Sequence, residues 1–495
     1  MKGIYNKVKR NISIFKLKLI SIVFMVGFAL YFYSPSQALS TSENFTVNQG
    51  SDSLKDDLVE ESRRKYLLLD RRIIQQTENA VLKVGRVEKY AGNPLFVEDK
   101  EWENRYDNFY GNVIFDKEEN LYKCWYSPFI IDTSAKGMTL EERNAEYSPP
   151  KGRRMGICYA TSVDGIVWDK PNLNLVDYQG SSENNILWMG PHGAGIFKDE
   201  KASDPSTKYK AIFQGLSVGF SEDGIHWSDR IHIDGLKIPG DTHNNAFWAP
   251  NLNKYVGITR TFGDKGRQVT RIESDDFLHW DNEEVVMQGE NANLQPYSMP
   301  VFYYAGLYIG LVAIHNQESD RVWTELAWSP DSKEWIRISP GSPLIPCSET
   351  ALDYDYGCVY ACANPVFLDN EIRLYYGGSD WKHFGWRNGC LAMATLRPDG
   401  FAGYQGLSDH SPSKITTIPL AYSGQSIQIN ADVEPGGWVN IGLYDGEKGD
   451  LLAEKRMTTT ANNTTVDFGQ DIDVDSIQLK FEFSQSKVYS FTFVE

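Results

Sequence analysis

The chain has 495 residues and a mass of 56.2 kDa, more than one ordinary domain holds, so we expect one large domain and one small one. Aromatic residues make up 13% of the chain, and its 41 glycines and 21 prolines favour turns and short strands over long helices. The formal net charge of −17 argues against a protein that binds nucleic acid.

The first 38 residues have the features of an export signal. Six basic side chains and no acidic one lie here, all ahead of an uncharged, largely apolar run over 19–33. Ser36 and Ala38 supply the small residues that a signal peptidase needs. The run is shorter than the ~20 residues of a spanning helix, although an uncleaved anchor remains an alternative. We predict a signal peptide or membrane anchor over 1–38, a polar linker over 39–62, and a body outside the cytoplasm: extracellular, periplasmic or membrane-anchored.

One motif, Ser-x-Asp-x-x-x-Trp, returns four times between residues 162 and 335. Its tryptophans are Trp168, Trp227, Trp280 and Trp335, at separations of 59, 53 and 55 residues, and residues 397–401 resemble a degenerate fifth copy. Repeats of this length in a β-rich chain are typical of a propeller with one four-stranded blade per repeat. The spacing therefore predicts a five-bladed β-propeller over 63–408, with a polar loop inserted in the first blade over 130–153.

The motif itself has a structural interpretation. We expect the Ser and Asp oxygens to accept the amides of a tight turn, Gly to take a positive φ, and Trp to close the joint between neighbouring blades. His226 and His279 lie inside this turn, which predicts that they are surface residues.

The pattern changes over 411–495, where apolar and polar residues alternate with a period of two. The alternating segments are Ile427–Ile429, Trp438–Leu443, Ile477–Phe483 and Tyr489–Phe493. Half-buried antiparallel strands of this kind predict a C-terminal β-sandwich. The predicted fold is thus all-β, a five-bladed β-propeller followed by a β-sandwich.

The six cysteines are too few for a disulfide scaffold, although one disulfide in an exported chain remains open. Cys358 and Cys362 have no second pair at zinc spacing, which favours buried small side chains over a metal site. The sequence therefore assigns no metal ligands and implies no cofactor.

Candidate site residues lie just before the strands that would line the propeller axis. Carboxylates, imidazoles, amides and phenols recur at this position of the repeat, although the strands that follow it are apolar. Because inner strands converge, these side chains can meet at one mouth of the central funnel. The predicted substrate-binding residues are Asn108, His192, His243, Asn244, Arg260, Tyr297, Tyr356, Trp381 and His383.

Three acids at the same phase, Asp107, Asp241 and Asp355, could supply the chemistry of glycosidic bond cleavage. That reaction needs one carboxylic acid to protonate the leaving oxygen and one carboxylate to activate water or attack the sugar. Glu349 competes for the acid role. Each aspartate could instead cap a loop at the start of a strand, and Trp381 could be packed rather than stacked on a sugar.

These residues resemble those of the five-bladed propeller glycoside hydrolases, the arabinanase, levansucrase and invertase superfamily, and especially exported bacterial proteins labelled glycoside hydrolase family 32 N-terminal-like. The resemblance covers about 65–495 and rests on segments 93–96, 106–108, 155–165, 241–244 and 488–491. It implies that Asp107 is base or nucleophile and that Asp241 orients or stabilises the transition state. The general acid is unassigned, because no clear Glu-Cys-Pro motif is present. By analogy, a structural calcium ion on the axis is allowed.

The sequence therefore predicts an exported glycoside hydrolase that acts on an oligo- or polysaccharide with paired carboxylates. It predicts a carbohydrate partner, no nucleic acid, and contact with a membrane only through an uncleaved N-terminal segment. Two alternatives remain open: a non-catalytic carbohydrate-binding propeller and a sialidase-like enzyme, for which Arg154, Arg260 and Arg271 would have to bind a substrate carboxylate.

Overall fold

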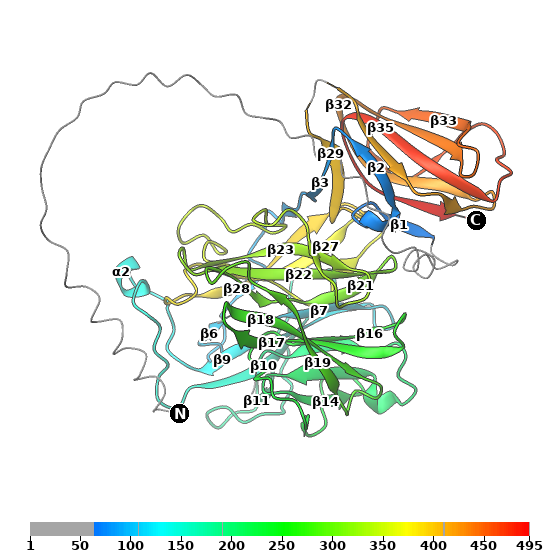
Figure 1. Cartoon of the computed structure of the whole chain (residues 1–495). Helices are drawn as coiled ribbons and strands as arrows, with labels where there is room; N and C mark the ends of the chain where they lie inside the picture. Colours follow the sequence, from blue (N-terminus) through cyan, green and yellow to red (C-terminus); the bar gives the residue numbers. More distant parts are fainter. Residues whose placement is uncertain (1–63, 107, 191, 409–410, 495) are drawn as a thin grey trace, which may run out of the picture. The chain divides into compact units, whose positions relative to one another are not determined.

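The computed structural model describes residues 64–106, 108–190, 192–408 and 411–494, and these form mainly antiparallel β-sheets (Figure 1). Helical structure in these ranges is limited to α2 (Leu140–Arg143) and the 3-10 turns η1 (Arg71–Ile73) and η2 (Pro205–Thr207). The all-β class, with a propeller and a terminal sandwich, is confirmed. The predicted signal and linker lie outside the described residues. Of the helices described, none has the length and apolar character needed to cross a bilayer.

Strand pairing groups the middle of the chain into three separate antiparallel sheets and one 11-stranded sheet. A parallel contact between Val322 and Cys358 divides the larger sheet into two antiparallel parts, which we describe as units 4 and 5. Unit 1 contains β7 (Asn112–Asp116), β8 (Leu121–Tyr126), β10 (Arg154–Ser162) and β11 (Ile186–Met189), widened by β6 (Arg105–Tyr106) and β9 (Pro128–Ile131). Unit 2 contains β12 (Gly195–Lys198), β13 (Tyr209–Phe213), β14 (Ser217–Ser221) and β15 (Ile231–His232). Unit 3 contains β16 (Asn245–Ala249), β17 (Lys254–Gly263), β18 (Gly266–Ser274) and β19 (Asp281–Gln288).

Unit 4 contains β21 (Val301–Tyr304), β22 (Leu307–Asn316), β23 (Arg321–Ser329) and β24 (Ile336–Arg337), and β20 (Leu294–Ser298) also pairs with β22. Unit 5 contains β25 (Cys358–Ala361), β26 (Val366–Phe367), β27 (Ile372–Ser379) and β28 (Gly389–Leu396). Its outer edge comes from the N-terminal side of the chain, because β4 (Glu88–Lys89) and β5 (Phe96–Val97) pair with β28. The two ends of the propeller are therefore joined within one sheet.

The innermost strands lie next to one another in series, and asparagines link them. Asn112 accepts a hydrogen bond from the amide of Ile196 (3.0 Å), which joins units 1 and 2, and Asn245 accepts one from the amide of Val301 (2.9 Å), which joins units 3 and 4. A parallel bridge between Asn112 and Ala363 joins unit 5 to unit 1. Residues that precede these strands are thereby brought to one end of a closed ring.

The repeated turns form as predicted. In the second copy, Ser221 Oγ accepts the amide of Gly224 (2.9 Å) and Asp223 accepts the amides of Ile225 and His226 (2.8 Å each). The fourth position of the motif, directly after the Asp, has a positive φ in all four copies, even where it is Phe277 (66°) or Ser332 (66°). His226 and His279 are exposed, as expected.

The turn, rather than its tryptophan alone, joins neighbouring units. The carbonyl of Gly224 accepts the indole N–H of Trp125 in unit 1 (2.7 Å), and the carbonyl of Gly165 accepts the hydroxyl of Tyr375 in unit 5 (2.9 Å). Ser332 likewise accepts from Arg271 of unit 3 (2.9 Å). Three of the four turns are therefore hydrogen-bonded to a neighbouring unit.

The C-terminal sheet is built around two long strands, β32 (Ser426–Asp445) and β35 (Ser476–Val494), which pair along most of their length. The sequence predicted two separate segments in each of them. The register of this pair shifts between Val433 and Trp438, where the ladder is interrupted. The other strands of this region are β30 (Ser413–Thr417), β31 (Leu420–Ala421), β33 (Leu451–Met457) and β34 (Ala461–Val466).

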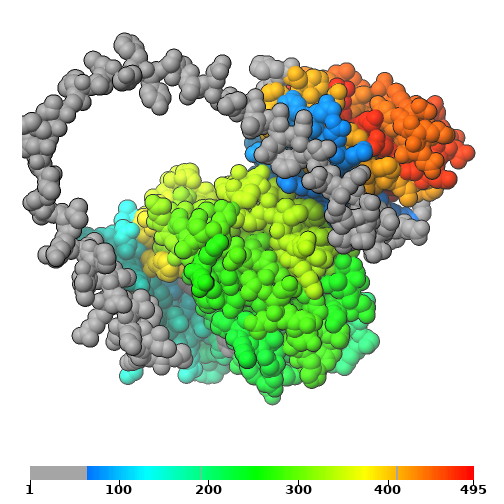
Figure 2. All heavy atoms as spheres, viewed as in Figure 1, coloured from blue at the N-terminus to red at the C-terminus, as the bar shows by residue number. Residues whose placement is uncertain are grey.

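This sheet also recruits residues from outside 411–495. Strands β1 (Lys65–Leu67), β2 (Ile74–Glu78), β3 (Ala80–Val84) and β29 (Ala402–Gly406) all belong to it, whereas the sequence placed them in the range 63–408 of the propeller. Figure 2 shows the blue N-terminal strands against the orange and red C-terminal ones. A strand's own residues do not specify its hydrogen-bond partner, so the pattern alone did not reveal this assignment.

All six cysteines are free, and Cys358 and Cys362 are buried, in agreement with their interpretation as small core side chains. Burial raises the pKa of Cys390 and of Cys124 well above the ordinary thiol value. These thiols are therefore kept in their unreactive protonated form.

Candidate functional site

Side chains that precede or lie within four of the innermost strands meet around Tyr110. Its ring stacks on His243 of unit 3 (centroids 5.3 Å apart) and meets the edges of His192 of unit 2 (5.6 Å) and Tyr360 of unit 5 (6.1 Å). Phe109 and Tyr110 both have a positive φ (61° and 46°), a conformation that is costly for aromatic residues and is held here by the surrounding contacts. Tyr110 is not among the residues predicted from the sequence, because the predicted site segment ends at Asn108.

Tyr297 of unit 4 completes the cluster. Its hydroxyl accepts from Asn108 Nδ2 (3.2 Å) and bonds His383 Nε2 (3.0 Å), and Asn108 Nδ2 also donates to the Tyr110 hydroxyl (2.8 Å). The guanidinium groups of Arg260 and Arg267 each lie 4.8 Å from the centre of the Tyr297 ring. The predicted residues Asn108, His192, Tyr297, Arg260 and His383 are thus brought together.

Asp241 presents a carboxylate to solvent at this mouth. Its side chain is 53% exposed, while its ion-pair partner Arg260 is buried, with Nη2 3.2 Å from Oδ2 of Asp241. The other oxygen accepts from Gln214 Nε2 (2.7 Å), and Gln214 Oε1 meets His192 Nδ1 (2.9 Å). A cavity of about 580 Å³ lined in part by Gln214, Asp229 and Arg230 adjoins this group. Asp241 is therefore oriented by two partners and still open to a ligand.

Asp107 lies outside the described residues. Its successor Asn108 is buried in the cluster and accepts from Arg387 Nη2 at Oδ1 (3.0 Å). Arg387 also donates to the carbonyl of His383, which ties the 380–388 loop to the same group. The described end of this segment is thus fixed by unit 5.

The structure does not bring Asp355 to the mouth. Its side chain is 1% exposed, forms an ion pair with Lys89 (2.6 Å) and accepts from the Tyr376 hydroxyl (3.0 Å). A buried, ion-paired carboxylate is not available to a substrate, so the predicted catalytic role of Asp355 is replaced by a structural one. The competing acid Glu349 is 89% exposed, and its ion-pair partner is Arg321, outside the cluster.

Two other predicted substrate-binding residues, Trp381 and Tyr356, pack against each other in unit 5. Trp381 is 6% exposed and stacks on Tyr356 (5.5 Å, 28°), whose other neighbour is the guanidinium of Arg321 (4.7 Å). An indole covered in this way offers no free face to a sugar. The packed interpretation of Trp381 therefore fits, and the binding role of Trp381 and Tyr356 does not.

His243 and Asn244 are also internal. His243 bonds Asn112 (3.3 Å), and burial lowers its pKa to about 3, so it is neutral at ordinary pH. Asn244 is fully buried, donates to the carbonyl of Gly193 (3.0 Å) and accepts from Thr259 (2.7 Å). These two side chains support the mouth from below rather than facing a ligand.

Polar residues at the end of the second strand of units 2 and 4 were not predicted from the sequence. They are Gln214, which follows β13, and His315, which lies near the end of β22. Arg260 has the equivalent place in β17 of unit 3. A polar residue at the end of an apolar strand is the sequence signal that could have identified Gln214 and His315. The three arginines invoked for a sialidase do not converge, because Arg271 binds Glu273 (2.6 Å) while Arg154 is exposed.

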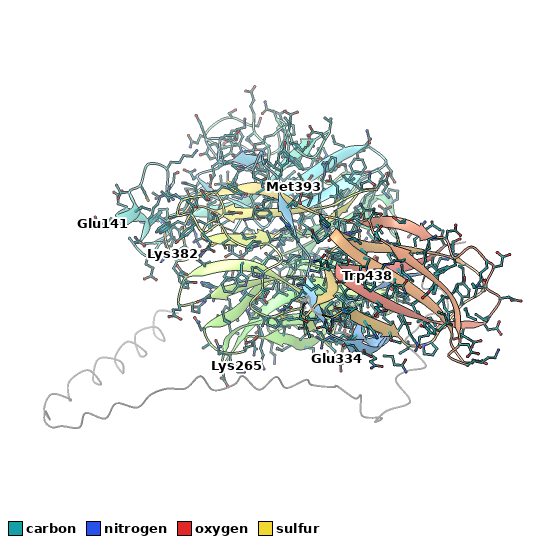
Figure 3. The ribbon with its side chains drawn as sticks, turned by 90° about the horizontal axis from the view of Figure 1, so that it is seen from above. Glu141, Lys265, Glu334, Lys382, Met393 and Trp438 are labelled. Carbon is teal, nitrogen blue, oxygen red and sulfur yellow. The ribbon has the colours of Figure 1, made fainter. Side chains whose placement is uncertain are left out.

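The loop inserted in unit 1 packs against the loop that carries His383. Arg143 of α2 forms an ion pair with Asp380 (2.8 Å), and its carbonyl accepts the amide of Trp386 (3.0 Å). The labelled residues Glu141 and Lys382 lie on the same side of the molecule (Figure 3). This insertion therefore braces one wall of the mouth.

Glu98 anchors the segment that leads to Asp107. It is buried and accepts the amides of Tyr106 (2.9 Å) and Gly389 (2.7 Å) at one oxygen. Burial raises its pKa from 4.5 to about 7, helped by the nearby Asp380 and opposed by the two amides.

Replacing Glu98 by Gln is expected to remove a pH dependence of stability. With a folded pKa of about 7 against 4.5, the folded chain retains a proton that the unfolded chain releases, so this stabilisation is complete below pH 4.5 and lost as the pH rises through 7. The wild type should therefore lose about 3 kcal/mol relative to Glu98→Gln between pH 4.5 and pH 8. Urea unfolding at both pH values measures it, with the exposed Glu141→Gln as control. A constant difference would contradict the buried, protonated state.

No family model matches the sequence, and a search of curated proteins finds no significant match. Similar solved structures include an N-acetylgalactosamine deacetylase from F. plautii (13% identity, TM-score 0.39, 65% of this chain and 96% of that one) and an α-L-arabinofuranosidase from Podospora anserina (13%, 0.42, 63% and 97%). A glycosyl hydrolase from Bacteroides ovatus is also similar (14%, 0.41, 66% and 97%). The fold and the clustered lead-in residues define the chain as a β-propeller protein with a mouth built from several units.

Proposed function

We propose that the protein is a glycoside hydrolase whose reaction takes place at the mouth around Tyr110 and Asp241. The observation that carries the proposal is the solvent-facing carboxylate of Asp241, oriented by Gln214 and Arg260 among aromatic and hydrogen-bonding side chains from several units. Hydrolysis of a glycosidic bond requires such a carboxylate next to a second acid.

Asp241 acts as an anion in this proposal. An ion-paired carboxylate can stabilise the positive charge that develops on the sugar ring in the transition state, and Gln214 fixes its direction. Asp107, which immediately precedes the clustered Asn108 in the sequence, is proposed as the base or nucleophile. Its partnership with Asp241 rests on the sequence resemblance.

The remaining groups would bind and orient the sugar. Arg267 lies beside Tyr297 at intermediate exposure, and His192 holds Gln214 behind the exposed carboxylate (2.9 Å). Sugar hydroxyls need donors and acceptors of this kind, whereas Phe262, which is 54% exposed, offers an apolar face. The substrate would be met outside the cytoplasm, because the first 38 residues have the features of an export signal.

A panel of oligo- and polysaccharides incubated with the full chain tests the proposal through the release of reducing ends. We expect turnover of at least one glycan by the wild type and a loss of about 10²-fold or more in Asp107→Asn. Glu349→Gln, which alters the competing exposed acid, should retain activity. Binding of a glycan without any turnover would instead indicate a non-catalytic carbohydrate-binding propeller.

A further inference from the structure

Two imidazoles and a carboxylate meet at the wall of the mouth formed by units 4 and 5. His315 lies near the end of β22, Asp320 lies in the turn between β22 and β23, and His383 lies in the loop after β27. One ligand atom from each of the three lies within 4.8 Å of those of the other two. Of these three residues, only His383 is predicted from the sequence to lie at the site, as a substrate-binding residue.

The distances suit a small cation. Nε2 of His315 forms a hydrogen bond of 3.0 Å with Oδ1 of Asp320, which a bound ion would replace, and Nδ1 of His383 is 3.8 Å from the same oxygen. Ligands at about 2.0 to 2.2 Å from a first-row transition ion stand roughly 3 to 3.5 Å apart, so small side-chain adjustments would complete the site.

A second observation independently points to a missing ligand. Nδ1 of His383 has no hydrogen-bond partner, although the residue is only 9% exposed. A buried ring nitrogen normally finds a partner, because leaving it unsatisfied costs free energy. This nitrogen faces the carboxylate of Asp320, where an ion would lie between them.

The outer contacts of the three side chains fit the ligand role. The opposite nitrogen of His383 bonds the Tyr297 hydroxyl (3.0 Å), and the opposite nitrogen of His315 meets the side-chain amide of Gln317 (2.7 Å), which can accept when its amide is turned. The second oxygen of Asp320 accepts the amide of Phe384 (2.7 Å). Each potential ligand is therefore oriented from behind, as in established metal sites.

A neutral imidazole binds a metal ion through the lone pair of its unprotonated ring nitrogen. Arg387 lies beside the cluster and donates to the carbonyl of His383. Its positive charge disfavours an added cation, so we expect moderate affinity.

We propose that His315 Nε2, His383 Nδ1 and a carboxylate oxygen of Asp320 bind one divalent first-row transition-metal ion, with Zn²⁺ as the physiological candidate. Two nitrogens and one oxygen suit such an ion better than Ca²⁺, which prefers six to eight oxygens. The ion would fix the loop after β27 to unit 4 and hold His383 against Tyr297. This role is separate from the proposed hydrolysis, because the site stands whether or not the protein cleaves a glycan.

Metal binding by the full chain tests the inference directly. The purified protein is stripped with a chelator, dialysed and titrated with CoCl₂ by visible absorption, and ZnCl₂ is then added to displace the Co²⁺. We expect one Co²⁺ per chain with a ligand-field spectrum typical of nitrogen ligands, and displacement by Zn²⁺ but not by CaCl₂.

Variants assign the ligands. Asp320→Asn and His383→Gln should each weaken Co²⁺ binding by at least 10-fold, while circular dichroism checks that they remain folded. His279→Ala is the matched control, because His279 is also paired with an aspartate (2.7 Å to Asp276) but is 89% exposed and has no third ligand. The inference is overturned if the wild type binds no Co²⁺, if both ligand variants bind it as well as the wild type, or if His279→Ala abolishes it.

Discussion

Replacing Asp241 by Asn is expected to lower kcat by about 10²- to 10⁴-fold on the best glycan of the panel, with a smaller effect on KM. The amide has the same shape and can still bond Gln214, but it carries no charge to stabilise the sugar cation in the transition state. It also leaves the buried Arg260 without its ionic partner. Initial rates over a range of substrate concentrations separate the two parameters.

The control is Asp264→Asn, an exposed aspartate in the turn between β17 and β18. It removes the same charge from the same unit but has no ion pair with Arg260. If Asp241→Asn retained wild-type kcat while the wild type turned over glycans, Asp241 would have no part in the reaction. Comparable losses in both variants would point to a general electrostatic effect rather than a role at the mouth.

Replacing Asp399 by Ala is expected to cost about 3–5 kcal/mol of unfolding free energy. Its side chain is fully buried and receives four donors, from Lys65 (3.1 Å), Tyr304 (2.5 Å), Asn430 (2.9 Å) and Ser490 (2.6 Å). These come from β1, from unit 4 and from the two long C-terminal strands. Removing the carboxylate leaves a cation and three polar groups without their shared acceptor.

Urea unfolding measures this loss, and Asp164→Ala is the matched control. Asp164 holds the corresponding place in the first copy of the repeated turn, accepts the amides of Ile166 (2.8 Å) and Val167 (2.9 Å) and lies near the surface. We expect it to cost about 1 kcal/mol. Equal losses in the two variants would mean that the four-donor network adds nothing to an ordinary turn.

Much of the mouth could be predicted because equivalent positions of a repeat lie at equivalent places in the fold. Once the tryptophans gave the length of a unit, Asn108, His192, Asp241 and Tyr297 followed as residues that precede inner strands, and the structure brings them to one cluster. The same rule failed for Asp355. It occupies the expected phase, but Lys89 from the N-terminal side of the chain neutralises it. The position of a residue within its repeat predicts where the residue lies, but it does not predict which side chain pairs with it.

Residues His315 and Asp320 illustrate the opposite failure. Neither residue precedes an inner strand, which is where the site residues were predicted to lie. No motif spacing relates them to His383, more than 60 residues further along the chain. Their proximity depends on the hydrogen bond from the amide of His383 to the carbonyl of Asp320 (2.9 Å), a contact between a turn and a loop of different units. Such contacts leave no periodic signal, because loops carry no repeating geometry.

The sequence by itself determined the β class, the repeat, the chemistry of its turns and the presence of a distinct C-terminal region, since these depend on local hydrogen bonding and on alternation of apolar residues. Only the tertiary structure decided that β1–β3 join the C-terminal sheet, that β4 and β5 close the last unit, and that Asp241 stays exposed while Asp355 is buried. Strand partners and burial depend on which segments, far apart in the chain, pack together most favourably. The residues of a single segment do not determine this.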